Sequence, residues 1–294
     1  MRILFVTSNR LGDAILSTGL LDHLIRTHKD ARITVVCGPV AQDVFARMPN
    51  RACTIVLEKR PYGRHWLPLW ARVVASRWDL VVDIRGSALS WLVPTRRRAV
   101  MRRRGGHKTA QLGAILGLNP PPLPVAWTAP RDRAVAEGLL PANRPVIALA
   151  PTANWAPKTW PAERFAALFR ALRSARFPEA VPLVVAGPGD AERTMAAPLL
   201  AALPDAIDLV GRLMLPETAA CLARAALFVG NDSGLMHLSA STGAPTLGLF
   251  GPTNAGEYAP AGRCAAAVVG PSARMEDLSV ERVLAGVGGL LGGG

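Results

Sequence analysis

The sequence predicts an α/β protein built from two doubly wound, Rossmann-like domains that face each other across a cleft. Three observations lead to this prediction. Short runs rich in Val, Ile and Leu alternate with longer helical patterns, this alternation occurs twice, and a proline-rich stretch separates the two halves. Apolar strands separated by helices are typical of a parallel sheet covered on both faces. The length of 294 residues also suits two domains of about 150 residues each.

The first half begins with a strand and then alternates. Its expected strands lie at 2–7, 33–38, 54–59 and 80–86, and its expected helices at 11–28, 41–49 and 66–77. The second half repeats the arrangement. Its expected strands lie at 145–151, 182–187, 207–211, 227–232 and 246–252, with helices near 161–175, 190–202, 216–225 and 234–242. The final GVGGLLGGG is expected to be a frayed tail rather than a packed helix end or a nucleotide loop.

The proline-rich segment 119–145 carries only one short helical piece, so we place the domain junction within it. The predicted domains are residues 1–140 and 141–294. Ligands of doubly wound sheets bind outside the carboxyl ends of the strands. Functional residues are therefore expected in the loops that follow the strands.

The formal net charge of +13 comes entirely from the first half of the chain. Residues 1–143 contain 22 Lys+Arg and 9 Asp+Glu, whereas the remainder contains 12 of each. The densest part is TRRRAVMRRRGGHK, at 95–108. A field of this sign concentrates anionic partners such as nucleic acid, an acidic membrane or a phosphorylated substrate. Solvated charges in an arginine-rich protein are the alternative interpretation.

No apolar run reaches the roughly 20 residues that span a bilayer, and the N-terminus lacks the features of a signal peptide. We therefore expect the chain to stay in the cytoplasm. The four cysteines, Cys37, Cys53, Cys221 and Cys264, are isolated and show no metal-ligand spacing. They are expected to be buried free thiols rather than a zinc or redox site.

The loop after the first strand, TSNRLGDAIL, places Arg10, Gly12 and Asp13 at the start of a helix. The helix dipole stabilises a carboxylate at that position, so the side chain of Asp13 should stay ionised. The residues alone also allow Asp13 to be a simple N-terminal helix charge.

The loop APTANWAPKTWP follows the first strand of the second half and contains Thr152, Ala153 and Lys158. A lysine among small residues suits a pyrophosphate group, although an exposed loop lysine is an equal alternative. In GPGDAE (187–192), Gly187 lets the backbone pass close to a ligand, but the motif is weak as a dinucleotide fingerprint.

The stretch GNDSGLMHLSASTGAPTLGLFGPT (230–253) runs from a strand into a helix start. Backbone amides at a helix start bind anions without a cationic side chain, and Gly234 allows close approach. Asp232 and Ser233 are alternatively N-caps, and His237 is alternatively a core histidine.

Together, RLGDAILSTGLL, PTANWAPKTWP and the 230–253 stretch resemble the bacterial ADP-heptose:lipopolysaccharide heptosyltransferases, glycosyltransferase family nine. VVDIRGSALSW also resembles the fourth N-domain strand of that family. The resemblance spans both halves in the right order. It implies a GT-B fold in which the N-terminal domain binds the acceptor and the C-terminal domain binds a nucleotide-sugar.

The resemblance also implies roles for individual residues in an inverting transfer. Asp13 matches the general base, and Lys158 matches the lysine that stabilises the departing diphosphate. The donor-binding candidates are Thr152, Ala153, Lys158, Gly187, Leu213, Met214, Asp232, Ser233, Gly234, Leu235 and His237. The acceptor-binding candidates are Arg10, Gly12, Arg85, His107 and Lys108.

The sequence contains no Asp-x-Asp pair, the motif that metal-dependent sugar transferases use, so no metal or other cofactor is expected. The expected donor is ADP-heptose, or another ADP- or UDP-linked sugar, because the motifs chiefly recognise phosphate. The implied acceptor is an anionic glycolipid at the cytoplasmic face of the inner membrane. Attraction of the basic half to that surface is expected to make the chain a peripheral membrane protein.

Two alternatives belong to other functional classes. An NAD-dependent dehydrogenase needs GxGxxG directly after its first strand, and the RLGD loop does not supply it. A non-catalytic RNA- or membrane-binding protein would use the arginine run. Nucleic-acid modules interleave aromatic and basic residues, but residues 95–108 contain no aromatic side chain, so no nucleic-acid partner is expected.

Overall fold

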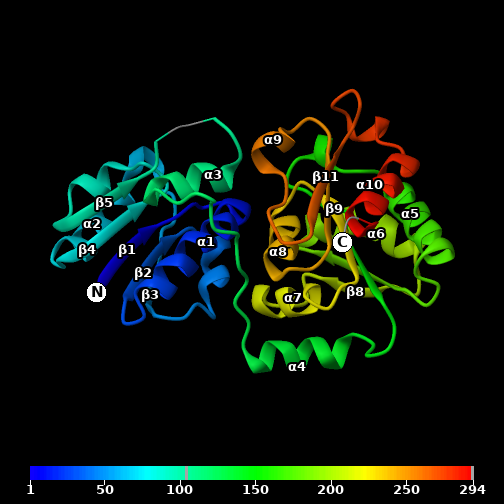
Figure 1. Cartoon of the computed structure of the whole chain (residues 1–294), viewed down its shortest axis with the longest axis horizontal. Coiled ribbons are helices and arrows are strands. Elements are labelled where there is room, and N and C mark those ends of the chain that lie inside the picture. Colours follow the sequence, from blue (N-terminus) through cyan, green and yellow to red (C-terminus); the bar gives the residue numbers. More distant parts are fainter. Residues whose placement is uncertain (103–104, 293–294) are drawn as a thin grey trace. The chain divides into compact units, whose positions relative to one another are not determined.

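The computed structural model describes residues 1–102 and 105–292. Its contacts divide the chain into two compact units, unit 1 (Met1–Trp127) and unit 2, which begins at Thr128. Each unit is built on one parallel sheet with helices between the strands (Figure 1). The prediction of two parallel-sheet α/β domains is confirmed.

Unit 1 has a five-stranded sheet in the order β3-β2-β1-β4-β5. Its strands are β1 (Arg2–Val6), β2 (Arg32–Cys37), β3 (Arg51–Val56), β4 (Trp78–Asp83) and β5 (Thr95–Val100). Its α-helices are α1 (Leu11–Thr27), α2 (Trp66–Val74) and α3 (Lys108–Gly113), and its 3₁₀ helices are η1 (Pro39–Phe45), η2 (Pro61–Gly63), η3 (Ala88–Trp91) and η4 (Ala114–Leu116). From β1 the chain adds β2 and β3 on one side of the sheet and then β4 and β5 on the other. The carboxyl ends of β1 and β4 therefore form the switch point where ligands bind in such sheets.

Unit 2 has a six-stranded sheet in the order β11-β10-β9-β6-β7-β8. Its strands are β6 (Val146–Ala150), β7 (Val181–Ala186), β8 (Ile207–Val210), β9 (Leu227–Asn231), β10 (Thr246–Phe250) and β11 (Ala265–Val269). Its helices are α4 (Pro130–Leu139), η5 (Ala156–Lys158), α5 (Ala162–Ala175), α6 (Asp190–Ala202), α7 (Leu215–Leu222), α8 (Gly234–Thr242), α9 (Ala255–Tyr258), η6 (Met275–Asp277) and α10 (Val280–Gly292). This is the strand order of a dinucleotide-binding Rossmann sheet, with its switch point between β6 and β9.

The central strands of both sheets are buried on both faces. Every residue of β6 and β9 is buried, and so are all residues of β1 except Arg2. Strands buried on both faces have continuous apolar sequences, and for this reason the sequence pattern predicted their positions. In unit 2 the largest core side chains include Trp160 and Phe165, whose rings meet edge to face with centroids 4.9 Å apart.

The division between the units lies between Trp127 and Thr128, within the proline-rich segment 119–145 but before helix α4 rather than at residue 140. Helix α4 packs against α7, and the two helices lie side by side in Figure 1. The guanidinium of Arg224 also donates a 2.8 Å hydrogen bond to the carbonyl of Ala136 in α4. These contacts make α4 part of unit 2.

Two edge strands escaped the sequence analysis. Strand β5 reads TRRRAV and pairs with β4 at the edge of the sheet. Its three arginines are exposed and interrupt the apolar pattern. Strand β11 reads AAAVV and pairs only with β10. Edge strands need less apolar sequence than central ones because solvent covers part of their surface.

The expectation of a frayed tail over GVGGLLGGG is wrong for the described residues up to Gly292. They form the end of helix α10, in which Val283 and Val287 are fully buried. Gly286 permits the close packing, since a Cβ there would lie 2.4 Å from Cγ2 of Val268 in β11. The glycines allow contact with the sheet, and the valines supply the buried surface.

Two of the four thiols match the expectation of burial. Cys37 and Cys221 are buried, whereas Cys53 and Cys264 are half-buried, and all four are free. Burial raises the pKa of the Cys37 thiol to about 12 and that of Cys221 to about 11. Both thiols therefore stay protonated and unreactive at neutral pH. Across residues 1–102 and 105–292, no helix has the length and apolar character needed to cross a membrane.

Packing of α10 can be tested by comparing two glycines on the same helix. Gly286→Ala should lower the free energy of unfolding by about 1 kcal/mol, because steric overlap with the stiff Val268 side chain outweighs the gain in helix propensity. Gly288 has no atom within 4 Å of its Cβ position, so Gly288→Ala should raise that free energy by about 0.5–1 kcal/mol. Urea unfolding curves distinguish the two, and equal stabilisation by both substitutions would show that the tail is not packed.

Candidate functional site

The carboxyl ends of two neighbouring strands of unit 2, β6 and β9, carry most of the polar residues predicted to bind a donor. Strand β9 ends in Gly230 and Asn231, and both are buried. A Cβ on Gly230 would lie 2.8 Å from Cβ of Ala150 in β6, so glycine is required for the close approach of the two strands. The loops after β6 and β9 therefore start from closely spaced points.

Asn231 connects these loops through a side chain that is completely buried. Its Nδ2 donates to the carbonyl of Pro151 at 2.7 Å, and its Oδ1 accepts from the amide of Trp160 at 3.1 Å. Both ends of the loop after β6 are thus attached to the end of β9. A buried amide with both groups satisfied makes the geometry of the loop specific.

Trp160 is the second anchor of this loop. The indole is buried, and its Nε1 donates a 2.8 Å hydrogen bond to the carbonyl of Leu278. The short helix η5, which ends at Lys158, is therefore held two residues from a fixed point. Loop residues before the anchor, from Asn154 to Pro157, are exposed.

Lys158 and Asp232 form an ion pair at this switch point. Nζ of Lys158 lies 2.7 Å from Oδ2 of Asp232, and the two side chains are only 19% and 10% exposed. The amide of Asp232 donates to the carbonyl of Leu249 in β10, which fixes the backbone that carries the carboxylate. An ammonium group has three donors, so Lys158 can hold Asp232 and still donate to a ligand.

Helix α8 begins directly after Ser233, which has an extended backbone and no side-chain cap. The first turn of the helix therefore presents backbone amides without intrahelical partners. Within the described part of the chain, Ser233 Oγ and Thr253 Oγ1 are buried without a hydrogen-bond partner. Of the remaining predicted residues in this region, Gly234 is half-buried, while Leu235 and His237 are buried in the helix.

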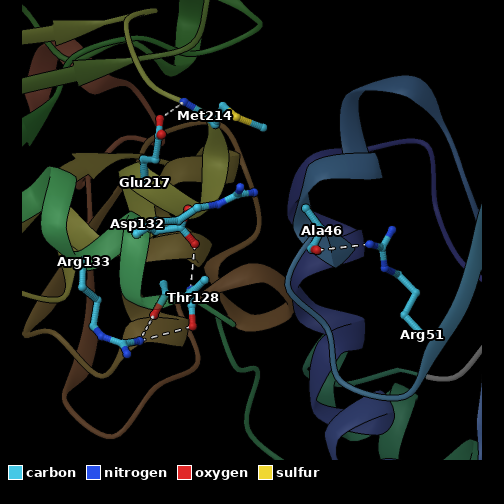
Figure 2. A network of polar contacts seen from close by, with 9 residues as sticks. Ala46, Arg51, Thr128, Asp132, Arg133, Met214 and Glu217 are labelled. Carbon is cyan, nitrogen blue, oxygen red and sulfur yellow. Dashed lines mark hydrogen bonds and ion pairs between the residues drawn. The ribbon is translucent and has the colours of Figure 1, made fainter.

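The other predicted donor residues lie along the same edge of the sheet. Thr152 and Ala153 follow β6 and are buried, and Gly187 follows β7. Leu213 and Met214 follow β8, where the side chain of Glu217 accepts a 2.8 Å hydrogen bond from the Met214 amide, as Figure 2 shows. The predicted residues are thus spread over the ends of four strands.

Glu192 was not singled out as a site residue by the sequence analysis. Its Oε2 is buried and lacks a hydrogen-bond partner in residues 1–102 and 105–292. Its side chain lies against Gly187, 3.6 Å from the position a Cβ would take. The signal was present in GPGDAE, whose last residue is this glutamate. A buried carboxylate oxygen without a donor suits a hydroxyl group of a ligand.

A pocket of about 670 Å³ opens beside the loop after β6. It is lined mainly by proline, methionine and Trp160 side chains, and none of the predicted donor residues lines it. Two of its three charged residues, Arg274 and Glu276, are paired with each other, and the third is Glu163. Since none of the predicted donor residues lines this pocket, the switch point is the better candidate for the site.

In unit 1 the corresponding switch point carries Asp13. It lies in the first turn of α1, and its Oδ2 accepts a 3.3 Å hydrogen bond from Oγ of Ser8. Its Oδ1 is buried and has no hydrogen-bond partner in the described residues. A carboxylate oxygen in this state can accept a proton or a hydrogen bond from a ligand.

Arg85 follows the neighbouring strand β4 and lies close to the loop after β1. Its Nη1 donates to Oδ1 of Asn9 at 3.3 Å, and its guanidinium stacks on the ring of Trp66 at 4.9 Å. Burial lowers the pKa of Arg85, while Asp83 acts in the opposite direction. Asp83 is fully buried and accepts 2.8 and 2.9 Å hydrogen bonds from the amides of Arg85 and Ser87, so it orients this turn.

The remaining acceptor candidates are less closely grouped. Arg10 is exposed and Gly12 is half-buried, both beside Asp13 in sequence. His107 caps helix α3, where its Nδ1 lies 2.8 Å from Oγ1 of Thr109, and Lys108 is half-buried. Two arginines of the basic run, at 103 and 104, lie outside the described residues. Among those that are described, no three His, Cys, Asp or Glu side chains cluster as metal ligands.

Comparison with protein families gives a match that covers most of the chain. The family model described as glycosyltransferase family 9 (heptosyltransferase) matches residues 93–287. The match includes every predicted donor residue but excludes Asp13 and Arg85.

Individual relatives and structures agree with this match. Lipooligosaccharide heptosyltransferase 2 of Haemophilus influenzae is 26% identical over 306 residues, which cover 88% of this chain and 86% of the relative. A family 9 glycosyltransferase of Veillonella parvula has a similar fold, with a TM-score of 0.83, 22% identity and coverage of 100% and 97%. The E. coli heptosyltransferase WaaC, solved with ADP, gives a TM-score of 0.76, 17% identity and coverage of 99% and 100%.

The role of Asn231 can be tested by stability. Asn231→Ala leaves the Pro151 carbonyl and the Trp160 amide buried without partners, and should lower the free energy of unfolding by about 2–4 kcal/mol. Asn154→Ala, in the exposed part of the same loop, should change that free energy by less than about 0.5 kcal/mol. Chemical denaturation measures both variants. Similar small effects would mean that Asn231 does not anchor the loop.

Proposed function

Because the chain belongs to glycosyltransferase family 9, we propose that it transfers a heptose or related sugar from an ADP-linked donor to an anionic glycolipid. We further propose that transfer inverts the anomeric carbon and needs no metal ion. Family membership makes the chain a glycosyltransferase. The dehydrogenase and non-catalytic alternatives are therefore rejected.

The paired Lys158 and Asp232 at the switch point of unit 2 are the observation that carries the proposal. When the bond between the sugar and the diphosphate breaks, negative charge grows on the diphosphate. The Lys158 ammonium and the amides at the start of α8 would stabilise that charge from fixed positions. The buried hydroxyls of Ser233 and Thr253 offer further hydrogen bonds to phosphate oxygens.

Asp13 would act as the general base. An acceptor hydroxyl is a poor nucleophile until a carboxylate begins to remove its proton, and Oδ1 of Asp13 lacks a competing donor in the described residues. The hydroxyl oxygen then forms a bond to the anomeric carbon as the bond to the diphosphate breaks on the opposite face. Direct displacement of this kind inverts the anomeric centre, and the proton ends on Asp13.

Support for the donor and acceptor comes from the relatives and from charge. The E. coli enzyme of similar fold was solved with ADP, and the Haemophilus influenzae relative is named for lipooligosaccharide. A phosphorylated glycolipid also suits the excess of positive charge in residues 1–143. We therefore propose that the chain works as a peripheral protein on the cytoplasmic face of the inner membrane.

A transferase that uses a different nucleotide-sugar and acceptor is the second candidate. The features at the ends of β6 and β9 chiefly address phosphate groups, which are common to all such donors. Thermal-shift measurements separate the two candidates, because a ligand that binds the folded state raises the melting temperature. A shift with ADP-heptose and none with UDP-sugars supports the first candidate, and the reverse supports the second.

Replacement of the proposed base provides a test of mechanism. Asp13→Asn should lower kcat by about 10²-fold or more, because an amide cannot accept the proton, while the thermal shift with the donor stays unchanged. Asp22→Asn is the matched control on the same helix, where Asp22 pairs with Arg26. A kcat similar to that of the control would eliminate Asp13 as the base.

Metal independence can be tested by chelation. Initial rates in excess EDTA should remain within about twofold of those without it, because Lys158 and the amides of α8 supply the positive charge at the leaving group. Addition of Mg²⁺ to the chelated enzyme should produce no further rise. Loss of turnover in EDTA and its recovery with Mg²⁺ would contradict the proposal.

A further inference from the structure

Unit 1 exposes a cluster of large apolar side chains that its fold does not use. Four of them lie on helix α2 and at the end of η3, and we call these four residues the α2–η3 surface. Their exposed fractions are 70% for Leu67, 36% for Trp70, 65% for Trp91 and 61% for Leu92. Single exposed apolar residues are ordinary in folded proteins, but a contiguous group that includes two tryptophans marks an interaction site.

Helix α2 is apolar on both sides, which is unusual for a helix at the surface of a sheet. Leu69 and Val73 are buried in the core of unit 1. Leu67, Trp70 and Ala71 are exposed and stand at helical spacings of three and four residues, so they share the opposite side. One side of α2 therefore packs on the sheet, and the other presents apolar side chains to solvent.

A hydrogen bond joins the two parts of the α2–η3 surface. Nε1 of Trp70 donates to the carbonyl of Leu92 at 2.9 Å, which brings α2 next to the end of η3. The guanidinium of Arg98 lies 5.5 Å from the ring of Trp91 and donates to the carbonyl of Ser90 at 2.7 Å. The exposed side chains thus stand on a backbone that is fixed by polar contacts.

The chain segments that carry this surface are rich in positive charge and contain few acidic residues. Residues 59–78 contain five Lys+Arg and no Asp or Glu, and no acidic residue occurs between Asp83 and Asp132. The exposed arginines closest in sequence to the surface include Arg64, Arg72 and Arg97. Of the three acidic residues nearest in sequence, Asp83 is buried, Asp79 pairs with Arg96, and Glu58 is exposed.

We propose that the α2–η3 surface docks on an anionic phospholipid bilayer, with its leucines and tryptophans in the interfacial region and its arginines at the headgroups. Tryptophan and leucine on one side of a helix with basic residues at its margin is the composition of an interfacial helix. The arginines gain from the negative potential of the leaflet, and the apolar side chains gain from leaving water.

The same surface fits other macromolecules less well. Single-stranded nucleic acid stacks on aromatic rings, but half of the surface consists of aliphatic leucine, which provides no stacking platform. A protein partner would have to match a large uncompensated positive charge around an apolar centre. A bilayer supplies both features in one plane.

This inference rests on the proposed function for the choice of an inner-membrane bilayer, but its test does not. Vesicle co-sedimentation uses the full chain with vesicles of phosphatidylcholine alone, or mixed with phosphatidylglycerol, and contains neither donor nor acceptor. Leu67→Ser combined with Trp91→Ser should lower the partition coefficient on the mixed vesicles by about tenfold or more. The matched control is Val40→Ser combined with Leu139→Ser, two other exposed apolar positions, which should bind as the native chain does.

A variant with fewer arginines distinguishes insertion of the apolar side chains into the bilayer from electrostatic attraction to its headgroups. Arg64→Gln combined with Arg97→Gln should weaken binding to mixed vesicles by about tenfold at low salt, and by less at high salt. Arg263→Gln combined with Arg282→Gln is its control in unit 2. Vesicle binding that falls only in the charge variant, or equally in all four variants, would overturn the proposal, and so would preferential binding of RNA over vesicles.

Folding and function are checked separately. Thermal melting should be the same for the serine variants and the native chain, because the substituted side chains are exposed. Transfer to a water-soluble acceptor without its lipid chains should also be unchanged in Leu67→Ser with Trp91→Ser, while transfer to an acceptor embedded in vesicles should fall with binding. If no sugar transfer occurs in the native chain but the vesicle results hold, the proposed function fails and the docking surface stands.

Discussion

The site in unit 2 depends on one buried amide, that of Asn231. A parallel sheet brings the ends of β6 and β9 together, but it does not determine the path of the loops that follow. Asn231 determines it, because its two hydrogen bonds reach Pro151 at the start of the loop after β6 and Trp160 at its end. Lys158 lies within the segment that these bonds enclose. Its pairing with Asp232, the residue after Asn231, follows from that constraint.

The sequence was sufficient for the features that depend on local pattern. Central strands such as β6 and β9 are buried on both faces, so their apolar runs located them. Because parallel strands end at a common edge, the loops with Thr152 and Asp232 could be placed near each other before any coordinates were known. The same reasoning put Asp13 at the start of α1, where the structure has it.

Features that depend on contacts between distant segments could not be read in this way. Helix α4 lies within the proline-rich segment 119–145, and its contacts with α7 and with Arg224 assign it to unit 2. Helix α10 has an end rich in glycine, which by propensity is a poor helix, but Gly286 allows contact with β11 and Val287 becomes buried. Glu192 is the last residue of the weak motif GPGDAE, but the burial of its Oε2 depends on the fold and cannot be inferred from the motif.

The pairing of Lys158 with Asp232 changes how the site is understood electrostatically. From the sequence alone, the lysine is expected to be a ligand for phosphate and the aspartate a separate residue. As a pair they are close to neutral, so the largely buried site does not contain an isolated charge, which would be costly to desolvate. An incoming diphosphate would add negative charge to this pair, and the unpartnered amides at the start of α8 are the groups available to balance it. In the proposed reaction, Asp232 would orient Lys158, and the amides of α8 would supply much of the affinity for phosphate.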